Sequence, residues 1–158
     1  MRILGIDPGT GILGFGVVDV KGSSFTLVTA GVIKTPPHTP LDERLEEIYD
    51  GLTEIIAETK PAILSIEKLF FAKNVTTAMS VSHARGVAIL AGRKAGLSYA
   101  EYTPLQIKQT ITGYGKADKN QVQEMIKLQL GLKEIPRPDD AADALGAAIT
   151  HAMMSRTN

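Results

Sequence analysis

Two short apolar runs, each ending in an acidic residue, place the tightest limit on the fold of this chain. Residues 2–7 (RILGID) and 62–67 (AILSIE) are apolar at most positions before the terminal Asp7 and Glu67. Runs of this kind are typical of strands buried on both faces of a sheet, with helices covering each side. An acid at the end of such a strand costs free energy unless something neutralises it. The pattern therefore predicts an α/β fold with two acidic side chains at the ends of buried strands.

The order of the remaining segments predicts how the sheet is built. Three strand-like segments come first, separated by turn residues, and this spacing is typical of an antiparallel meander. Helical periodicity then alternates with two further strands, which indicates a mixed sheet with helices on its faces. Asp118 and Gln121 fit a capping box at a helix start. The strands are expected at residues 2–7, 13–20, 25–34, 62–67 and 98–102, and the helices at 41–59, 75–95, 104–112, 118–130 and 138–154. We therefore expect an antiparallel meander followed by parallel strands, flanked by helices.

Length and composition exclude several kinds of protein. The chain has 158 residues and no long linker, which predicts a single domain over residues 1–158. It has no cysteine, so disulfides, thiolate catalysis and cysteine-based zinc sites are excluded. No apolar run approaches the roughly 20 residues that a membrane-spanning helix needs, so we expect no membrane partner.

Charge is unevenly distributed along the chain, although the formal net charge is zero. The stretch from Lys68 to Lys133 holds ten basic and three acidic residues, a balance of +7, and the remainder carries −7. A cationic middle indicates a polyanionic partner such as nucleic acid, although lysines that only solubilise helices would give the same pattern. Lys116 and Lys119 border a Gly-Tyr-Gly loop in this stretch and are candidates for phosphate contacts.

Four acidic residues could form one oxygen-rich site. Asp140 and Asp143 are three apart in the last predicted helix and so lie on one face of its first turn. Together with Asp7 and Glu67 they would repel one another unless divalent cations neutralised them. Hard oxygen ligands favour Mg²⁺ or Mn²⁺, and two such ions roughly 4 Å apart are usual in phosphodiester hydrolysis. Simpler explanations remain open, because the helix pair also complements the helix dipole and Asp7 precedes a Pro-Gly turn.

Several short motifs, taken in order, give the chain a resemblance to a known family. The motifs are ILGIDPGT at 3–10, AILSIEKLFFAKN at 62–74, ARGVA at 84–88, QIKQT at 106–110, GYGKADK at 113–119, DAADAL at 140–145 and AITH at 148–151. Through them the chain resembles, over nearly its whole length, the RuvC family of Holliday-junction resolvases. The resemblance implies an RNase H-like fold. It also implies a metal-dependent crossover junction endodeoxyribonuclease that nicks two strands of like polarity symmetrically during recombination and repair.

The resemblance also implies roles for individual residues. The catalytic and metal-binding acids would be Asp7, Glu67, Asp140 and Asp143, holding two Mg²⁺ ions per active site, with Mn²⁺ able to substitute. Asp139 would be an extra acid that caps the helix. The DNA-contacting residues would be Lys108 and Lys119 near the scissile phosphate and Phe70 against the bases at the junction centre, joined by Lys116 from the charge pattern.

The implied partners are a four-way DNA junction, a second copy of the chain, and the RuvA and RuvB branch-migration proteins in the bacterial cytoplasm. The helix expected at 75–95 is rich in small residues, so it is a candidate for the homodimer interface. Packing of this helix against its own sheet explains the small residues equally well.

Parts of the sequence are also compatible with three other functions. The Asp-Pro-Gly-Thr start resembles the phosphate loop of actin-like and sugar-kinase nucleotide-binding proteins, but those proteins use two domains and have no need of Glu67 or the helix pair. A related RNase H-like nuclease acting on an RNA–DNA hybrid would use the same four acids. A catalytically silent junction-binding module would not need all four of them.

Overall fold

The five strands form one mixed sheet with the order β3-β2-β1-β4-β5. In this computed structural model, which describes residues 1–69 and 75–156, the strands are β1 (Arg2–Asp7), β2 (Ile12–Lys21), β3 (Ser24–Lys34), β4 (Ile63–Glu67) and β5 (Ser98–Tyr102). Strands β1, β2 and β3 pair antiparallel, whereas β4 runs parallel to both β1 and β5. The predicted meander followed by parallel strands is confirmed.

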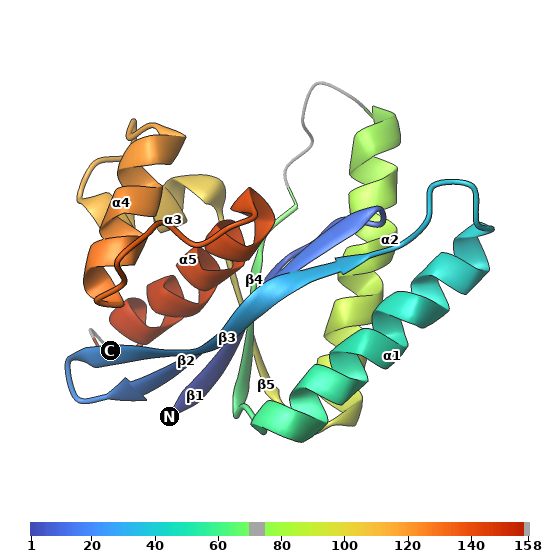
Figure 1. Cartoon of the computed structure of the whole chain (residues 1–158), viewed down its shortest axis with the longest axis horizontal. Helices are drawn as coiled ribbons and strands as arrows, with labels where there is room; N and C mark the ends of the chain where they lie inside the picture. The colour runs from blue at the N-terminus through green and yellow to red at the C-terminus, as the bar shows by residue number, and fades with distance from the viewer. Residues whose placement is uncertain (70–74, 157–158) are drawn as a thin grey trace.

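Helices cover both faces of the sheet (Figure 1). They are α1 (Leu41–Thr59) and α2 (Val75–Lys94) on one face, and α3 (Pro104–Thr112), α4 (Lys119–Gln129) and α5 (Asp139–Met154) on the other. The central strand β1 supplies Leu4 and Ile6 to the core under α1 and α2, and Ile3 to the core under α3–α5. This two-sided burial explains its continuous apolar sequence. Within the described residues, no helix is both long and apolar enough to cross a membrane.

The helix starts show which capping residues were predicted well. The Asp118 carboxylate accepts a hydrogen bond from the Gln121 amide at 2.8 Å, and the Gln121 side chain accepts one from the Asp118 amide, which confirms the capping box of α4. The prediction that Asp139 caps α5 was wrong. Pro138 is the N-cap residue and no side chain caps this helix, because Asp139 is already its first residue.

Helix α5 lies unusually close to β1 and β2 because three glycines leave room for it. A Cβ atom on Gly5 would lie 1.9 Å from the carbonyl oxygen of Ala144, and one on Gly14 would lie 2.0 Å from that of Asp140. On Gly16 it would lie 2.6 Å from the Leu145 side chain. Any larger residue would push the helix away from the sheet. We call Gly5, Gly14 and Gly16 the glycine seat, and it sets the depth at which α5 crosses the sheet.

Candidate active site

Asp7 and Glu67 end two neighbouring strands at the same edge of the sheet. Strands β1 and β4 are parallel, and Ile6 is aligned with Ile66. Asp7 and Glu67, the next residue in each strand, therefore lie side by side. Two residues earlier, Gly5 faces α5, and Ser65 donates a hydrogen bond to the Ala147 carbonyl of α5 at 2.7 Å. Because strand side chains alternate between faces, Asp7 and Glu67 also point toward α5. The carboxyl ends of parallel strands are the usual place for a ligand site in such sheets.

The first turn of α5 brings the second pair of acids to this edge. Gly14 of β2 lies opposite Asp7, and its missing side chain lets the Asp140 backbone lie directly over it. Asp143 follows on the same face of the helix. The structure therefore brings together the four acids that the sequence singled out, from three separate segments of the chain.

Burial and mutual repulsion act together on these carboxylates. Burial, followed by the charges of Asp143, Glu67 and Asp140 and a hydrogen bond to Asp140, raises the pKa of Asp7 to about 8. Burial and the Asp143 charge raise the pKa of Glu67, against the opposing effect of Lys108 and Lys119. Burial also raises the pKa of Asp143, although Lys119 opposes it. A site of this kind is unfavourable with all its acids ionised and no cation bound.

Lys119 makes the direct contacts to this acid cluster. Its Nζ lies 3.3 Å from a carboxylate oxygen of Asp143 and 3.4 Å from one of Asp139. Burial lowers the pKa of Lys119, but its two acidic partners outweigh that effect and the pKa is raised. Asp139 also accepts a hydrogen bond from Gln123 at 3.3 Å and lies 3.8 Å from Arg137, so it belongs to the flank of the site.

A cavity of about 320 Å³ opens beside the acids, between α3, α4 and α5. Glu67 and Asp143 line it together with Lys108 and Lys119, and its floor is apolar, with contributions from Ile107, Val122 and Ile126. The cavity therefore combines two of the acids with two cations that can meet a phosphate.

Lys116, another predicted DNA contact, is not among the residues that line this cavity. Lys116 is exposed on the loop before α4. Phe70 lies outside the described residues. Among the residues that are described, no three acidic or histidine side chains converge on a common point in the geometry of a metal site.

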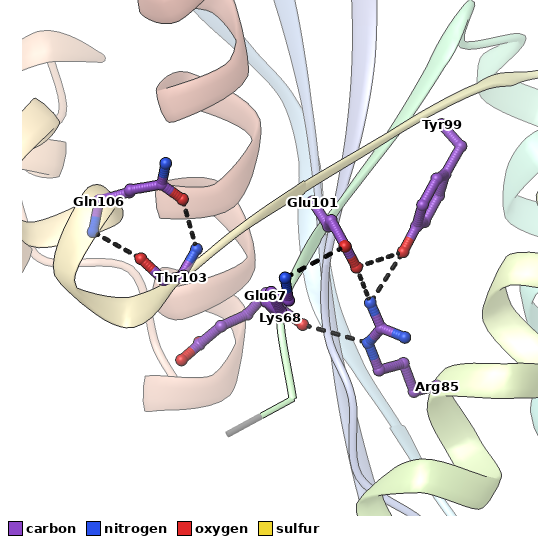
Figure 2. A network of polar contacts seen from close by, with 7 residues as sticks. All are labelled: Glu67, Lys68, Arg85, Tyr99, Glu101, Thr103 and Gln106. Atoms are coloured by element: carbon purple, nitrogen blue, oxygen red, sulfur yellow. Dashed lines mark hydrogen bonds and ion pairs between the residues drawn. The ribbon is translucent and has the colours of Figure 1, made fainter. Parts of the chain in front are cut away.

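A second polar cluster lies behind β4 and was not predicted from the sequence (Figure 2). Arg85 of α2 donates hydrogen bonds to Glu101 and, at 2.8 Å, to the Tyr99 hydroxyl, which itself donates to Glu101 at 2.8 Å. Lys68 Nζ lies 3.8 Å from the other Glu101 oxygen. We call Lys68, Arg85, Tyr99 and Glu101 the Glu101 clamp. In the sequence, the clamp is indicated only by an acidic residue, Glu101, within the fifth strand. The partner of Glu101 is Arg85, which lies sixteen residues away on a helix.

The glycine seat was also missed. Its signal was present, since Gly14 and Gly16 alternate along one strand and Gly5 lies in another. Glycines spaced by two mark a face where another backbone can approach closely. The sequence alone does not say which segment approaches, because α5 lies more than a hundred positions further along the chain.

A five-stranded mixed sheet with acids at the ends of β1 and β4 and on the facing helix defines a protein of the RNase H-like nuclease class. The family model for "Crossover junction endodeoxyribonuclease RuvC" matches residues 3–151. The chain belongs to the RuvC family. This assignment leaves the nucleotide-binding alternative without support.

Individual relatives agree with the family assignment. The crossover junction endodeoxyribonuclease RuvC of Desulforamulus reducens is 53% identical over 157 residues, which cover 99% of this chain and 96% of the relative. That of Brevibacillus brevis is 57% identical over 152 residues, covering 96% and 92% of the two chains.

Solved structures agree as well. Thermus thermophilus RuvC in complex with a Holliday junction substrate superposes with a TM-score of 0.95 at 40% identity, covering 99% of this chain and 96% of that one. The yeast mitochondrial Holliday junction resolvase shares the fold, with a TM-score of 0.64 at 14% identity over 98% and 80% of the two chains.

Proposed function

We propose that this chain is a DNA endonuclease that resolves Holliday junctions by nicking two strands of like polarity symmetrically. The observation that carries this function is the gathering of Asp7, Glu67, Asp140 and Asp143 at one sheet edge, beside a cavity lined by two lysines. The scaffold is the one found in a RuvC bound to a Holliday junction. Residues 1–158 would act as a single nuclease domain in recombination and repair.

The four acids would hold two divalent cations, Mg²⁺ or, as a substitute, Mn²⁺. The residues present fit such ions, since hard carboxylate oxygens suit them. Burial, and after it the charges of neighbouring acids, raises the pKa values of Asp7, Glu67 and Asp143, and a bound cation would relieve both effects. When bound, the ions supply Lewis-acid chemistry for phosphodiester hydrolysis. Asp7 must lose its proton before it can act as a ligand, so we expect acidic conditions to weaken metal binding.

The lysines would bind and orient the phosphodiester. Without DNA, Lys119 neutralises Asp143 and Asp139. With DNA and metal in place, Lys119 and Lys108 would offset the charge that develops on the scissile phosphate. Lys116 would contact the backbone nearby, and Phe70 would stack on or wedge between bases at the junction centre.

A two-fold substrate calls for a two-fold enzyme, and we propose that α2 forms the homodimer interface. The helix packs on its own molecule through Ala78, Ala84, Ala88, Ala91 and Gly92. On its outer side Val75, Met79 and Leu90 are more than half exposed. Large apolar side chains left in water on one helix are typical of an interaction surface. The further partners would be RuvA and RuvB in the bacterial cytoplasm.

The deciding experiment compares three substrates in the presence of Mg²⁺: a synthetic four-way junction, a linear duplex and an RNA–DNA hybrid. We expect paired nicks confined to the junction, which disappear with EDTA. Cleavage of the hybrid or duplex instead would leave the metal-carboxylate chemistry intact but assign the chain another substrate.

The Asp7→Asn variant tests the acid cluster in the same assay. We expect it to bind the junction with wild-type affinity and to lose cleavage by at least about a hundredfold, because a ligand is removed and no DNA contact is changed. The matched control is Asp19→Asn, which removes an acid paired with Arg2 at 2.7 Å outside the acid cluster. Wild-type cleavage by Asp7→Asn would contradict the assignment.

A further inference from the structure

The Glu101 clamp lies on the face of the sheet opposite the acid cluster. Glu101 is aligned with Ile66 of β4, whose side chain is buried in the core under α1 and α2. Glu67 is the next residue of β4, and its carboxylate lines the cavity between α3, α4 and α5. Figure 2 shows the Glu67 carboxylate directed toward α5 while Arg85 reaches the strand from the other side. The clamp therefore acts on the backbone that carries Glu67, not on its carboxylate.

Three contacts connect that backbone to the clamp and to β5. The Arg85 Nε donates a long hydrogen bond of 3.5 Å to the carbonyl oxygen of Glu67. Lys68, the residue that follows, pairs with Glu101 through its side chain, and its amide donates to the Tyr102 carbonyl at 2.7 Å. The residues on both sides of the Glu67–Lys68 peptide bond are thus tied to β5 and α2 just where β4 ends.

Arg85 is held firmly enough to serve as an anchor. Its side chain is only 17% exposed, and its charge is matched by Glu101, with the Tyr99 hydroxyl bridging the two. A hydrogen bond from the Tyr99 hydroxyl lowers the pKa of Glu101, and the charge and hydrogen bond of Arg85 and the charge of Lys68 lower it further, despite some burial. Charge-assisted bonds of an arginine fork fix direction as well as distance. Because Glu101 already occupies its guanidinium, Arg85 is poorly placed to contact a phosphate.

We propose that Arg85, oriented by Glu101 and Tyr99, is a positioning residue that fixes the end of β4 and thereby the Glu67 carboxylate in the metal-loaded site. This inference rests on the proposed function. It assigns to a residue on the opposite face of the sheet a part in the same reaction. Residues that orient metal ligands through an outer layer of contacts typically change metal affinity or activity by about 10- to 100-fold when altered.

The test uses Arg85→Gln, Glu101→Gln and the double variant, with Arg93→Gln as the matched control. Arg93 is an exposed arginine on the same helix, so its replacement removes the same charge. For Arg85→Gln we expect cleavage to fall about tenfold and the Mg²⁺ concentration for half-maximal cleavage to rise several-fold. Junction affinity and its dependence on salt should stay at wild-type values. The double variant should lose no more than Arg85→Gln alone, because the two residues act as one unit.

Two readouts need neither substrate nor turnover. Calorimetric titration of the DNA-free protein should show weaker divalent-cation binding in Arg85→Gln and unchanged binding in Arg93→Gln. Amide hydrogen exchange at Lys68, which directly follows β4, should accelerate in Arg85→Gln relative to the amides of β4. If wild-type protein cleaved no junction, the proposed function would fail, while these two readouts would still decide the role of the clamp.

Three outcomes would overturn the proposal. The first is unchanged metal dependence together with unchanged Lys68 exchange in Arg85→Gln. The second is weaker junction binding with the salt slope reduced by about one, which would make Arg85 a phosphate contact. If Arg85→Gln does not fold, Tyr99→Phe takes its place, since it removes only the bridging hydroxyl. For Tyr99→Phe we then expect weaker divalent-cation binding and faster Lys68 exchange, with smaller changes than in Arg85→Gln. Wild-type values of both quantities in Tyr99→Phe would be the third outcome that contradicts the proposal.

Discussion

At Asp7, burial and neighbouring charge act in the same direction. The carboxyl is largely enclosed and three other acids surround it, so its pKa rises to about 8. Near neutral pH the metal-free protein therefore holds a proton at the position where we propose that a cation binds. Asp7, to which we assign a catalytic role, is thus also a residue that weakens the fold when it ionises, and strongly shifted pKa values of this kind are common at functional sites.

The pH dependence of stability tests this environment. The pKa of Asp7 is higher in the folded state than its ordinary value of 3.8, so between about pH 4 and 8 the folded protein holds a proton that the unfolded chain has lost. The free energy of unfolding contributed by Asp7 is therefore present at low pH and is lost as the pH rises through this interval.

Asp7→Asn removes this dependence. At pH 8 in EDTA we expect the free energy of unfolding of the variant to exceed that of the wild type by at least about 1 kcal/mol, which corresponds to an increase in Tm of roughly 2–4 °C. At pH 5 the difference in free energy of unfolding should be clearly smaller, because only the first part of the interval between the two pKa values has been crossed. Thermal unfolding at several pH values measures the difference. Parallel curves for the two proteins would show that Asp7 is not the titrating group.

Lys119 gives a second prediction for a single residue. Because it is the cation in direct contact with the acid cluster, Lys119→Ala should slow cleavage and reduce the slope of log junction affinity against log salt by about 1. The matched control is Lys127→Ala on the same helix, where the lysine lies 3.8 Å from Glu124. Binding titrations from low to moderate salt measure the slope. A slope equal to that of the wild type would remove Lys119 from the phosphate contacts.

Among the elements, α5 has the most demanding placement, because its first turn must lie against the end of β1. Gly14 makes this possible, so Gly14→Ala should push the Asp140 backbone away from Asp7. We expect a loss of about 1–3 kcal/mol of stability and a larger proportional loss of cleavage. Thermal unfolding and the junction assay measure both effects.

The control for Gly14→Ala is Gly86→Ala in α2. Within the part of the chain that the structure describes, no atom other than the neighbouring residues and the backbone of its own helix lies within 4 Å of where this Cβ would be. A glycine-to-alanine change inside a helix raises stability by up to about 1 kcal/mol. A stable Gly14→Ala variant with wild-type activity would show that α5 can shift without disturbing the acids.

Elements that depend on local sequence were predicted well. The strands, the helices and the capping box of α4 follow from periodicity and from the Asp118–Gln121 spacing, since their determinants lie within a few residues. The gathering of Asp7 and Glu67 followed from strand ends. The ion pair of Lys119 with Asp139 did not, because it depends on how α4 and α5 pack together. The Glu101 clamp escaped prediction for the same reason.

For the whole molecule, the exposed apolar side chains of α2, which are Val75, Met79 and Leu90, form a candidate surface for association. If it forms the homodimer interface, Met79→Glu should convert the dimer to a monomer, because a buried, unpaired charge at an interface is strongly unfavourable. Sedimentation velocity at several protein concentrations measures the association. The variant should still fold, since Met79 is 58% exposed within one chain.

The control for this prediction is Leu128→Glu on α4, where the side chain is 71% exposed on another part of the surface. We expect it to remain a dimer. Dissociation by Leu128→Glu together with an intact Met79→Glu dimer would move the interface from α2 to α4.

The acids of the candidate site come from segments that are far apart in the chain: β1, β4 and α5. During synthesis, a chain that has been made only as far as residue 138 contains Asp7 and Glu67 but neither acid of α5. The glycine seat is then still uncovered, so the sheet edge cannot adopt its final arrangement. If the chain cleaves DNA as we propose, an unfinished polypeptide on the ribosome would therefore lack the complete active site.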